Sequence, residues 1–168
     1  MAANGFIAAS GALSMLDYVT GRSTALDAEW AAKTSAGDLA PKVSYLMLLS
    51  TTVTDAQTAM SALVPLEVTG TGYARQAVTW SAAQVTAAPD NKRVLASSDL
   101  IQFGPFADAG GLAQPVAAVA LVTRLTSPPA TPQGLALMVW NLAAPVTTVQ
   151  NQALQIASGS LKMELAVT

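Results

Sequence analysis

From residue 42 onward, short apolar runs alternate with clusters of turn-forming residues, and this pattern predicts a series of β-strands. The first run, Lys42–Ser50, is continuous enough in apolar residues for a strand that is buried on both faces. The last, Ser160–Val167, alternates apolar and polar residues with the period of two that is typical of a half-buried strand. Between them, clusters of glycine, proline and serine separate expected strands at Tyr73–Trp80, Asp99–Phe103, Val116–Thr123 and Leu135–Leu142. We therefore expect a mainly β protein, folded as an antiparallel β-sandwich or as a jelly-roll-like or barrel-like domain.

A helical pattern precedes the strands. Asn4 is a good helix cap, Gly21 a plausible end, and the apolar stripe between them consists of Phe6, Ala9, Leu13 and Leu16. This predicts a short N-terminal helix. Residues 22–41 are small and polar without a sustained period, which indicates an extended arm or linker. The expected organisation is thus a helix and arm over 1–41, followed by the β-sandwich-like domain over 42–168.

A second short helix is expected inside the β region. Asp55–Leu63 carries a helical pattern, with Thr54 as its N-terminal cap. Pro65 follows closely and is expected to stop this helix.

Composition limits the partners. The chain has 168 residues, of which 11% are charged, and its formal net charge is −2. A basic field that could hold a polyanion is missing, so nucleic acid is not an expected partner. The longest apolar runs are strand-sized, far below the roughly 18 residues of a membrane-spanning helix, so membrane insertion is not expected either. A surface so poor in charge weakly favours contact with other subunits.

The sequence contains neither histidine nor cysteine. This excludes the Ser-His-Asp triad, the Cys-His dyad and histidine-ligated zinc. Carboxylate chemistry remains, as in a glycosidase, but it needs two acids that converge on one cleft. The ten acids are scattered near expected turns and helix ends, where capping and solvation explain them: Asp17, Asp27, Glu29, Asp38, Asp55, Glu67, Asp90, Asp99, Asp108 and Glu164. We therefore expect a protein that is not an enzyme, with no catalytic residue, no metal and no cofactor.

Three aromatic residues leave a binding function open. Tyr73, Trp80 and Trp140 could form a platform on which a sugar ring stacks, as in a carbohydrate-binding β-sandwich. All three lie within strand patterns, however, where aromatic side chains usually belong to the core. The sugar-binding interpretation requires at least one of them to be exposed.

The segment Val68–Trp80 carries a resemblance to a known family. It is similar to the G-x-Y-A-R-Q-x-V-T-W segment of small virion proteins of tailed bacteriophages, common in phages of actinobacteria and often labelled tail fibre or minor tail proteins. The residues that carry it are Gly70, Gly72, Tyr73, Arg75, Gln76 and Trp80. Similarity continues in order through Ile101–Pro105, Val116–Thr123, Leu135–Leu142, Pro145–Thr147 and Leu154–Leu161. The chain departs from the family pattern at residues 21–41 and at Pro128–Gln133.

The resemblance implies a structural subunit at the surface of a phage particle, assembled in the host cytoplasm. Two roles remain open: an accessory protein of the minor-tail or tail-fibre type, and a decoration protein that cements the capsid. In either role the expected partners are other virion proteins and further copies of the chain, with a trimer favoured. We expect residues 1–41 to contact a neighbour, and the candidate interface residues are Phe6, Leu13, Leu16 and Trp30.

The residues of the shared segment also have a physical interpretation. Gly70 and Gly72 permit a tight turn, and the residues that follow alternate across a strand. Arg75 is expected to hold a buried carboxylate or carbonyl, either within the chain or across a subunit interface, and the contact within the chain is the favoured alternative.

Overall fold

The computed structural model describes residues 3–8, 11–13, 29, 43–54, 59–80, 84–85, 93–127, 130 and 132–166. Its elements in chain order are β1 (Ala3–Ile7), β2 (Ser44–Leu49), α3 (Met60–Leu63), η1 (Val64–Leu66), β3 (Gln76–Val78), β4 (Gln84–Val85), β5 (Arg93–Ser97), β6 (Ile101–Phe103), β7 (Val116–Val122), β8 (Ala136–Val146), β9 (Leu154–Ile156) and β10 (Lys162–Ala166). The predicted mainly β, antiparallel and sandwich-like fold is confirmed. Within the described residues, no helix combines the length and the apolar character that a membrane crossing needs.

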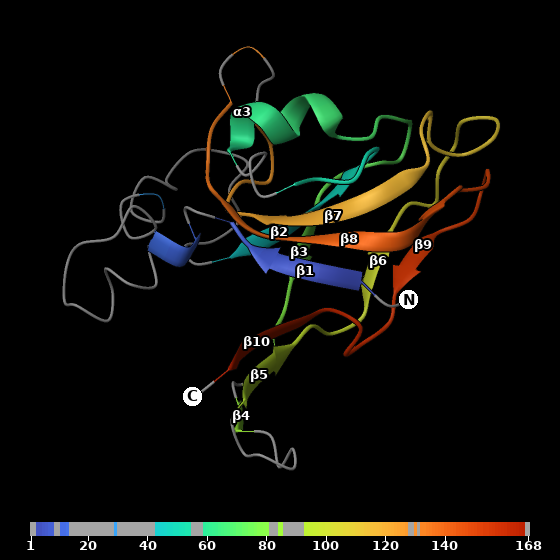
Figure 1. Ribbon diagram of the computed structural model, residues 1–168. Coiled ribbons are helices and arrows are strands. Elements are labelled where there is room, and N and C mark those ends of the chain that lie inside the picture. Colours follow the sequence, from blue (N-terminus) through green and yellow to red (C-terminus); the bar gives the residue numbers. More distant parts are fainter. Residues whose placement is uncertain are drawn as a thin grey trace.

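The centre of the fold is a five-stranded antiparallel sheet in the order β1-β8-β7-β2-β3 (Figure 1). Every residue of β2 and of β7 is buried, so these two strands are covered on both faces. The expectation of a doubly buried strand at Lys42–Ser50 is thereby confirmed. Along β2 the side chains alternate between two clusters, with Leu46 and Leu48 on one face and Tyr45, Met47 and Leu49 on the other.

Two apolar layers cover this sheet. On one face lies the short helical segment formed by α3 and η1, which packs Met60, Leu63 and Val64 against small residues of β7. On the other face lies the β6–β9 pair, whose Ile101 and Phe103 belong to the larger cluster. Figure 1 shows both layers, with α3 above the sheet and β6 and β9 below it.

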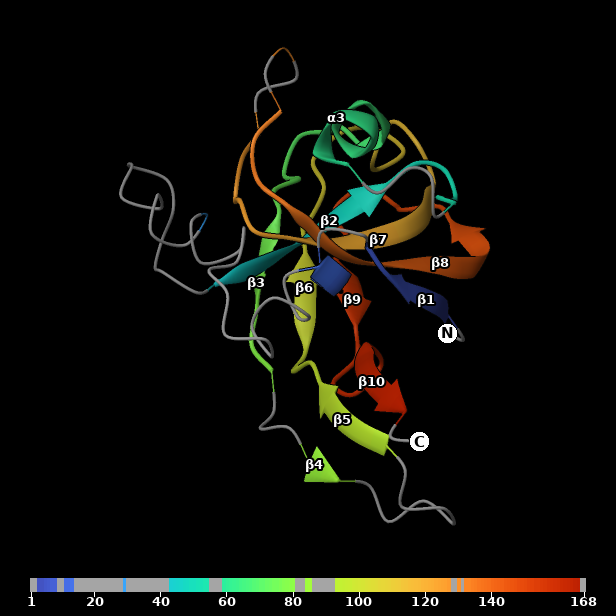
Figure 2. The ribbon, with the colours of Figure 1, turned by 60° about the vertical axis from the view of Figure 1, so that its left-hand side comes forward.

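A smaller antiparallel sheet, β10-β5-β4, lies beyond the β6–β9 pair and apart from the five-stranded sheet in both views (Figures 1 and 2). An isolated bridge between Trp80 and Ser98 joins the end of the β3 segment to the end of β5. The predicted final strand is therefore present as β10, in register with β5 from Lys162 opposite Ser97 to Ala166 opposite Arg93.

The predicted N-terminal helix is wrong for its first residues, because Ala3–Ile7 form strand β1. This strand pairs with β8 from Ala3 opposite Leu142 to Ile7 opposite Met138. The outer edge of β8 offers a row of backbone donors and acceptors, and pairing with it outweighs the local helical periodicity. Residues 11–13 do form a helical turn. The remainder of the expected helix and arm, with the exception of Ala8 and residue 29, lies outside the described residues, and the boundary at residue 41 stays a prediction.

Other boundaries differ from the sequence expectation in informative ways. Of the helix expected at Asp55–Leu63, the described part is helical from Met60, and Pro65 continues the chain as a 3-10 turn instead of stopping it. The strand expected at Tyr73–Trp80 is reduced to Gln76–Val78, whereas β8 runs four residues beyond its predicted end at Leu142. The sequence pattern missed β1, β4, β5 and β9. All but β1 are short or lie in turn-rich sequence where alternation is weak.

We expect substitutions of leucine to separate the core from the surface. Leu63 is 0% exposed and Leu100 is 58% exposed. Because a buried leucine leaves a cavity, Leu63→Ala should lower the free energy of unfolding by about 2–5 kcal/mol, whereas Leu100→Ala should change it by less than about 0.5 kcal/mol. Urea denaturation of both variants measures this, and equal losses would contradict the described packing.

Candidate functional site: the buried network around Arg75

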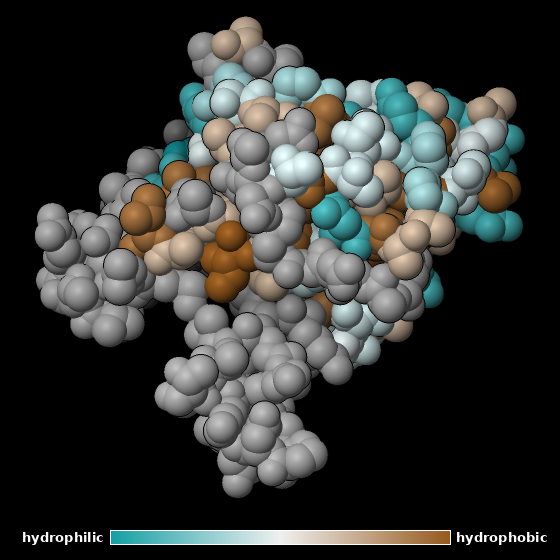
Figure 3. All heavy atoms as spheres, in the orientation of Figure 1, coloured by the Kyte–Doolittle hydropathy of each residue, from teal (hydrophilic) through white to brown (hydrophobic). Residues whose placement is uncertain are grey.

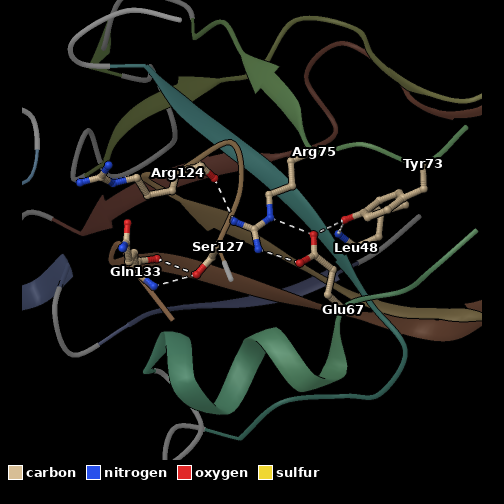
Figure 4. A network of polar contacts seen from close by, with 7 residues as sticks. All are labelled: Leu48, Glu67, Tyr73, Arg75, Arg124, Ser127 and Gln133. Atoms are coloured by element: carbon tan, nitrogen blue, oxygen red, sulfur yellow. Dashed lines mark hydrogen bonds and ion pairs between the residues drawn. The ribbon is translucent and has the colours of Figure 1, made fainter. Parts of the chain in front are cut away.

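The carboxylate of Glu67 is the centre of a buried polar network (Figure 4). Arg75 binds it with two parallel contacts, from Nε to Oε1 at 2.8 Å and from Nη2 to Oε2 at 2.6 Å. The hydroxyl of Tyr73 donates a third hydrogen bond to Oε1 at 2.8 Å. The Arg75 side chain is 3% exposed and that of Glu67 18% exposed. Such a bidentate pair is among the strongest polar contacts in proteins because charge and geometry match at both bonds.

The network satisfies the backbone of β2 where its neighbouring strand ends. Strand β3 pairs with β2 only at Ser44, Tyr45 and Leu46. Beyond that point the amide of Leu48 donates to the hydroxyl of Tyr73 at 3.1 Å, and the carbonyl of Leu48 accepts from the amide of Val68 at 3.1 Å. The hydroxyl of Tyr73 thus accepts the hydrogen bond of the Leu48 amide that a carbonyl of a neighbouring strand would otherwise accept.

Arg75 also reaches the connection between β7 and β8. Its Nη1 donates to the backbone carbonyl of Arg124 at 3.0 Å. One guanidinium group therefore joins the segment after η1, the start of β3 and the end of β7. The contact within the chain that we expected for Arg75 is present, with both a carboxylate and a carbonyl as acceptors.

The electrostatics keep Tyr73 in the form that the network needs. Burial raises the pKa of the Tyr73 hydroxyl, and the negative charge of Glu67 raises it further. The hydroxyl therefore remains protonated, so that it can donate to Glu67 while it accepts from Leu48. Three donors already engage Glu67, which makes this carboxylate a structural anchor and a poor candidate for acid-base chemistry.

The other residues of the shared segment also support the fold. Gly72 has φ +91°, and a Cβ there would collide with the backbone carbonyl oxygen of Pro105. At Gly70 a Cβ would lie 3.0 Å from Leu112 Cδ2. The side-chain amide of Gln76 donates to the carbonyl of Ala74 at 2.9 Å, a local contact at the start of β3.

Trp80 stacks on Trp140 with 6.4 Å between ring centroids and 26° between planes. Trp140 is 3% exposed, and both Tyr73 and Trp80 pack against the larger cluster. The aromatic residues therefore belong to the core, and the exposed platform that sugar stacking requires is not formed by these three residues.

The loops at one end of the sandwich are held mainly by backbone contacts. The amide of Ala107 donates to the carbonyl of Thr71 at 2.9 Å, and the amide of Asn151 to the carbonyl of Phe106 at 2.7 Å. Asp108 adds a side-chain contact, because its Oδ2 accepts from the amide of Thr71 at 2.6 Å. Hydrogen bonds from Thr71 lower the pKa of the Asp108 carboxyl. These loops are therefore fixed relative to one another, with Thr71 at the centre.

The candidate interface residues are placed only in part. Leu13 is 63% exposed, as an interface residue of a separate subunit would be. Phe6 lies in β1, whereas Leu16 and Trp30 lie outside the described residues.

Among the residues that the structure describes, acidic side chains do not gather into a group of three that could hold a metal ion. A small cavity of about 150 Å³ lies between β7, β8 and β9, with Val119, Leu142 and Ile156 among its lining residues. It is mostly apolar, and no carboxylate lines it.

Two partners of Arg75, Glu67 and the carbonyl of Arg124, are not among the residues predicted for the site. Glu67 was interpreted as a capping or solvated acid, although it is the nearest acid before Arg75 in the chain and a buried arginine needs a carboxylate. The carbonyl of Arg124 carries no sequence signal, because any residue supplies a carbonyl group.

Substitution of Arg75 should destabilise the protein strongly. Arg75→Met leaves the carboxylate of Glu67 without its cation, and we expect a loss of about 3–5 kcal/mol in the free energy of unfolding. Arg75→Lys retains the charge but cannot bind both oxygens in parallel, so its loss should be smaller. Denaturation by urea provides the measurement. A Met variant as stable as the wild type would show that the network does not hold the fold.

Asp108 should contribute to stability in a defined pH range. Its pKa in the folded state is lowered, so its contribution is fully present above the pKa of the unfolded chain, about 3.9, and disappears as the pH falls through the folded value. The urea midpoint of wild type should therefore exceed that of Asp108→Asn near pH 6, and the two should converge as the pH falls through the folded pKa of Asp108. Asp99→Asn, an exposed change of equal charge, is the control. A constant difference between wild type and Asp108→Asn across this range would refute the assignment.

Most of the chain matches a known protein family. Residues 23–164 match the family described as podophage GP4 fiber I protein gp80. No curated protein and no solved structure matches the chain. The match confirms the resemblance at the level of phage fibre proteins, while the restriction to phages of actinobacteria and the diagnostic value of the Tyr73–Trp80 segment stay predictions. Since the matched range includes both the network around Arg75 and nearly all of the described sheets, the chain belongs to the podophage GP4 fiber I protein gp80 family.

Proposed function

We propose that the chain is a non-enzymatic structural subunit of the tail-fibre apparatus of a tailed phage, exposed on the virion surface. The observation that carries this proposal is the family match over residues 23–164. The finer assignment, an accessory protein of the minor-tail or fibre-associated type, extends the family description to the place of this chain in the particle.

The geometry supports a structural role. The carboxylate of Glu67 is occupied by Arg75 and Tyr73, and the Asp108 carboxylate by the amide of Thr71. Both acids hold segments of the chain in place. On the face shown in Figure 3, hydrophilic and hydrophobic residues alternate over the described part of the surface. Such a mixed, weakly charged surface suits contact with protein neighbours.

We further propose that the partners are other virion proteins and additional copies of this chain, with a trimer as the favoured assembly. Two features support a contact through the N-terminal region. Leu13 exposes 63% of its surface, and β1 is one of the two edge strands of the five-stranded sheet. Edge strands present backbone groups that another chain can pair with.

The position in the particle can be tested on purified virions. Heads and tails are separated, and the protein is quantified in each fraction by mass spectrometry, with the major capsid and tail-tube proteins as references. We expect it in the tail fraction at the low copy number of a fibre component. Immunogold labelling should place it on the tail.

A protein that remains with the heads, in numbers that match the capsid lattice, would instead establish the decoration role. This outcome would overturn the tail assignment without affecting the description of the fold.

A further inference from the structure

Glu29 connects two parts of the chain that are distant in sequence. It is the residue of the 14–42 stretch that the structure describes, and it contacts the point where the chain leaves β7. Its Oε1 accepts a hydrogen bond from Thr123 Oγ1 at 3.1 Å, and the same oxygen forms an ion pair with Nε of Arg124. The side chains of Arg124 and Glu29 are 13% and 14% exposed, so the pair is largely withdrawn from water.

The contact lies at the root of the β7–β8 hairpin. Here a side-chain hydrogen bond replaces one of the backbone hydrogen bonds between the two strands. The amide of Thr123 still donates to the carbonyl of Leu135 at 3.1 Å, but the amide of Leu135 donates to Thr123 Oγ1 at 2.9 Å. Further out, Ser127 Oγ donates to the carbonyl of Gln133 at 3.1 Å and accepts from its amide at 2.7 Å (Figure 4). The hydroxyl of Thr123 therefore has two roles: it closes the root and it binds Glu29.

Gly134 makes the root tight. It has φ +92°, and a Cβ there would lie 2.7 Å from Cγ of Arg124 and 3.0 Å from Oγ1 of Thr123. The Arg124 side chain thus crosses the backbone of the returning strand before it reaches Glu29. The position of the Arg124 side chain and the position of the hairpin root are therefore coupled.

Two carboxylates help to position Arg124, one through its backbone and the other through its side chain. Glu67 acts through Arg75, which binds the backbone carbonyl of Arg124. Glu29 binds the side chain of Arg124, which points away from Arg75 in Figure 4. The first anchor belongs to the core of the fold. The second comes from Glu29, in the segment between β1 and β2, and binds a different part of residue 124.

We propose that Glu29 is a clasp that ties the segment between β1 and β2 to the root of the β7–β8 hairpin. When Glu29 is in place, the root of the hairpin at Thr123, Arg124 and Leu135 is held in one arrangement. When Glu29 is withdrawn, the hairpin loosens while the sheets and the Arg75 anchor persist. The proposal is independent of the position of the protein in the virion.

Hydrogen exchange on the full chain tests the clasp. We compare wild type, Glu29→Gln and Glu29→Ala, with Asp99→Asn as a control that removes one exposed negative charge elsewhere. The readout is the exchange rate of the amides of Leu135 and Gln133 at the hairpin, relative to those of Leu46 and Val119 in the central sheet. Loss of hydrogen bonds to a charged group should speed exchange at the hairpin roughly tenfold or more, with the sheet amides and the Asp99→Asn variant unchanged.

Equal acceleration of hairpin and sheet amides would overturn the proposal, because Glu29 would then support the fold as a whole. Unchanged hairpin exchange in Glu29→Ala would overturn it as well.

A double-mutant comparison gives a second, independent test. Arg124→Met removes the cation of the clasp but retains the backbone carbonyl that Arg75 binds. In the Arg124→Met background, Glu29→Gln should accelerate hairpin exchange much less than it does in wild type, because its charged partner is already gone. Equal acceleration in both backgrounds would show that Glu29 does not act through Arg124, and the clasp would be refuted.

Discussion

The structure depends on the complete burial of β2. A strand that is covered on both faces cannot leave its amides and carbonyls to water, so each one requires a partner inside the protein. Strand β7 supplies these partners along one side, but β3 supplies them along only half of the other. The remainder falls to the chain around Val68 and to the hydroxyl of Tyr73. That hydroxyl is oriented by Glu67, and Glu67 is neutralised by Arg75. A buried ion pair is thus the consequence of an unfinished strand pairing.

The strands around this ion pair include some that the sequence pattern predicts correctly and one that it does not. The doubly buried character of β2 follows from its continuous apolar run, and the positions of β6 and β7 follow from apolar runs bounded by turn residues. The strand at Tyr73–Trp80 was overestimated, because alternation alone does not reveal a phase change. Tyr73 and Arg75 point inward, and so do Val78 and Trp80, which means that the inward side shifts from odd to even positions between Arg75 and Val78. Such a shift depends on the positions of Glu67 and Leu48 in the folded protein, which the local sequence does not reveal.

In the N-terminal segment, the local pattern predicts one structure and pairing with a distant strand imposes another. The spacing of Phe6, Ala9 and Leu13 is compatible with a helix, but the edge of β8 offers Ala3–Ile7 a full set of backbone partners. Local periodicity is a weak preference, and an available sheet edge outweighs it. The contact of Arg75 with the carbonyl of Arg124 and the contact of Glu29 with Thr123 and Arg124 are long-range pairings for which single residues give no local signal. The need for a carboxylate at Arg75 could be foreseen, and Glu67 is the nearest acid before it in the chain, whereas the carbonyl of Arg124 could not be foreseen.

The loops around Thr71 have a different consequence. Their mutual positions are set largely by main-chain groups, with carbonyls of Thr71 and Phe106 bound by amides of Ala107 and Asn151. Main-chain hydrogen bonds are the same whatever side chain a residue carries. An exposed position here, such as Val149, can therefore change identity from one phage to the next while the loop framework stays constant. A surface of this kind can diversify rapidly without loss of folding, which is an advantage for a particle whose surroundings also evolve.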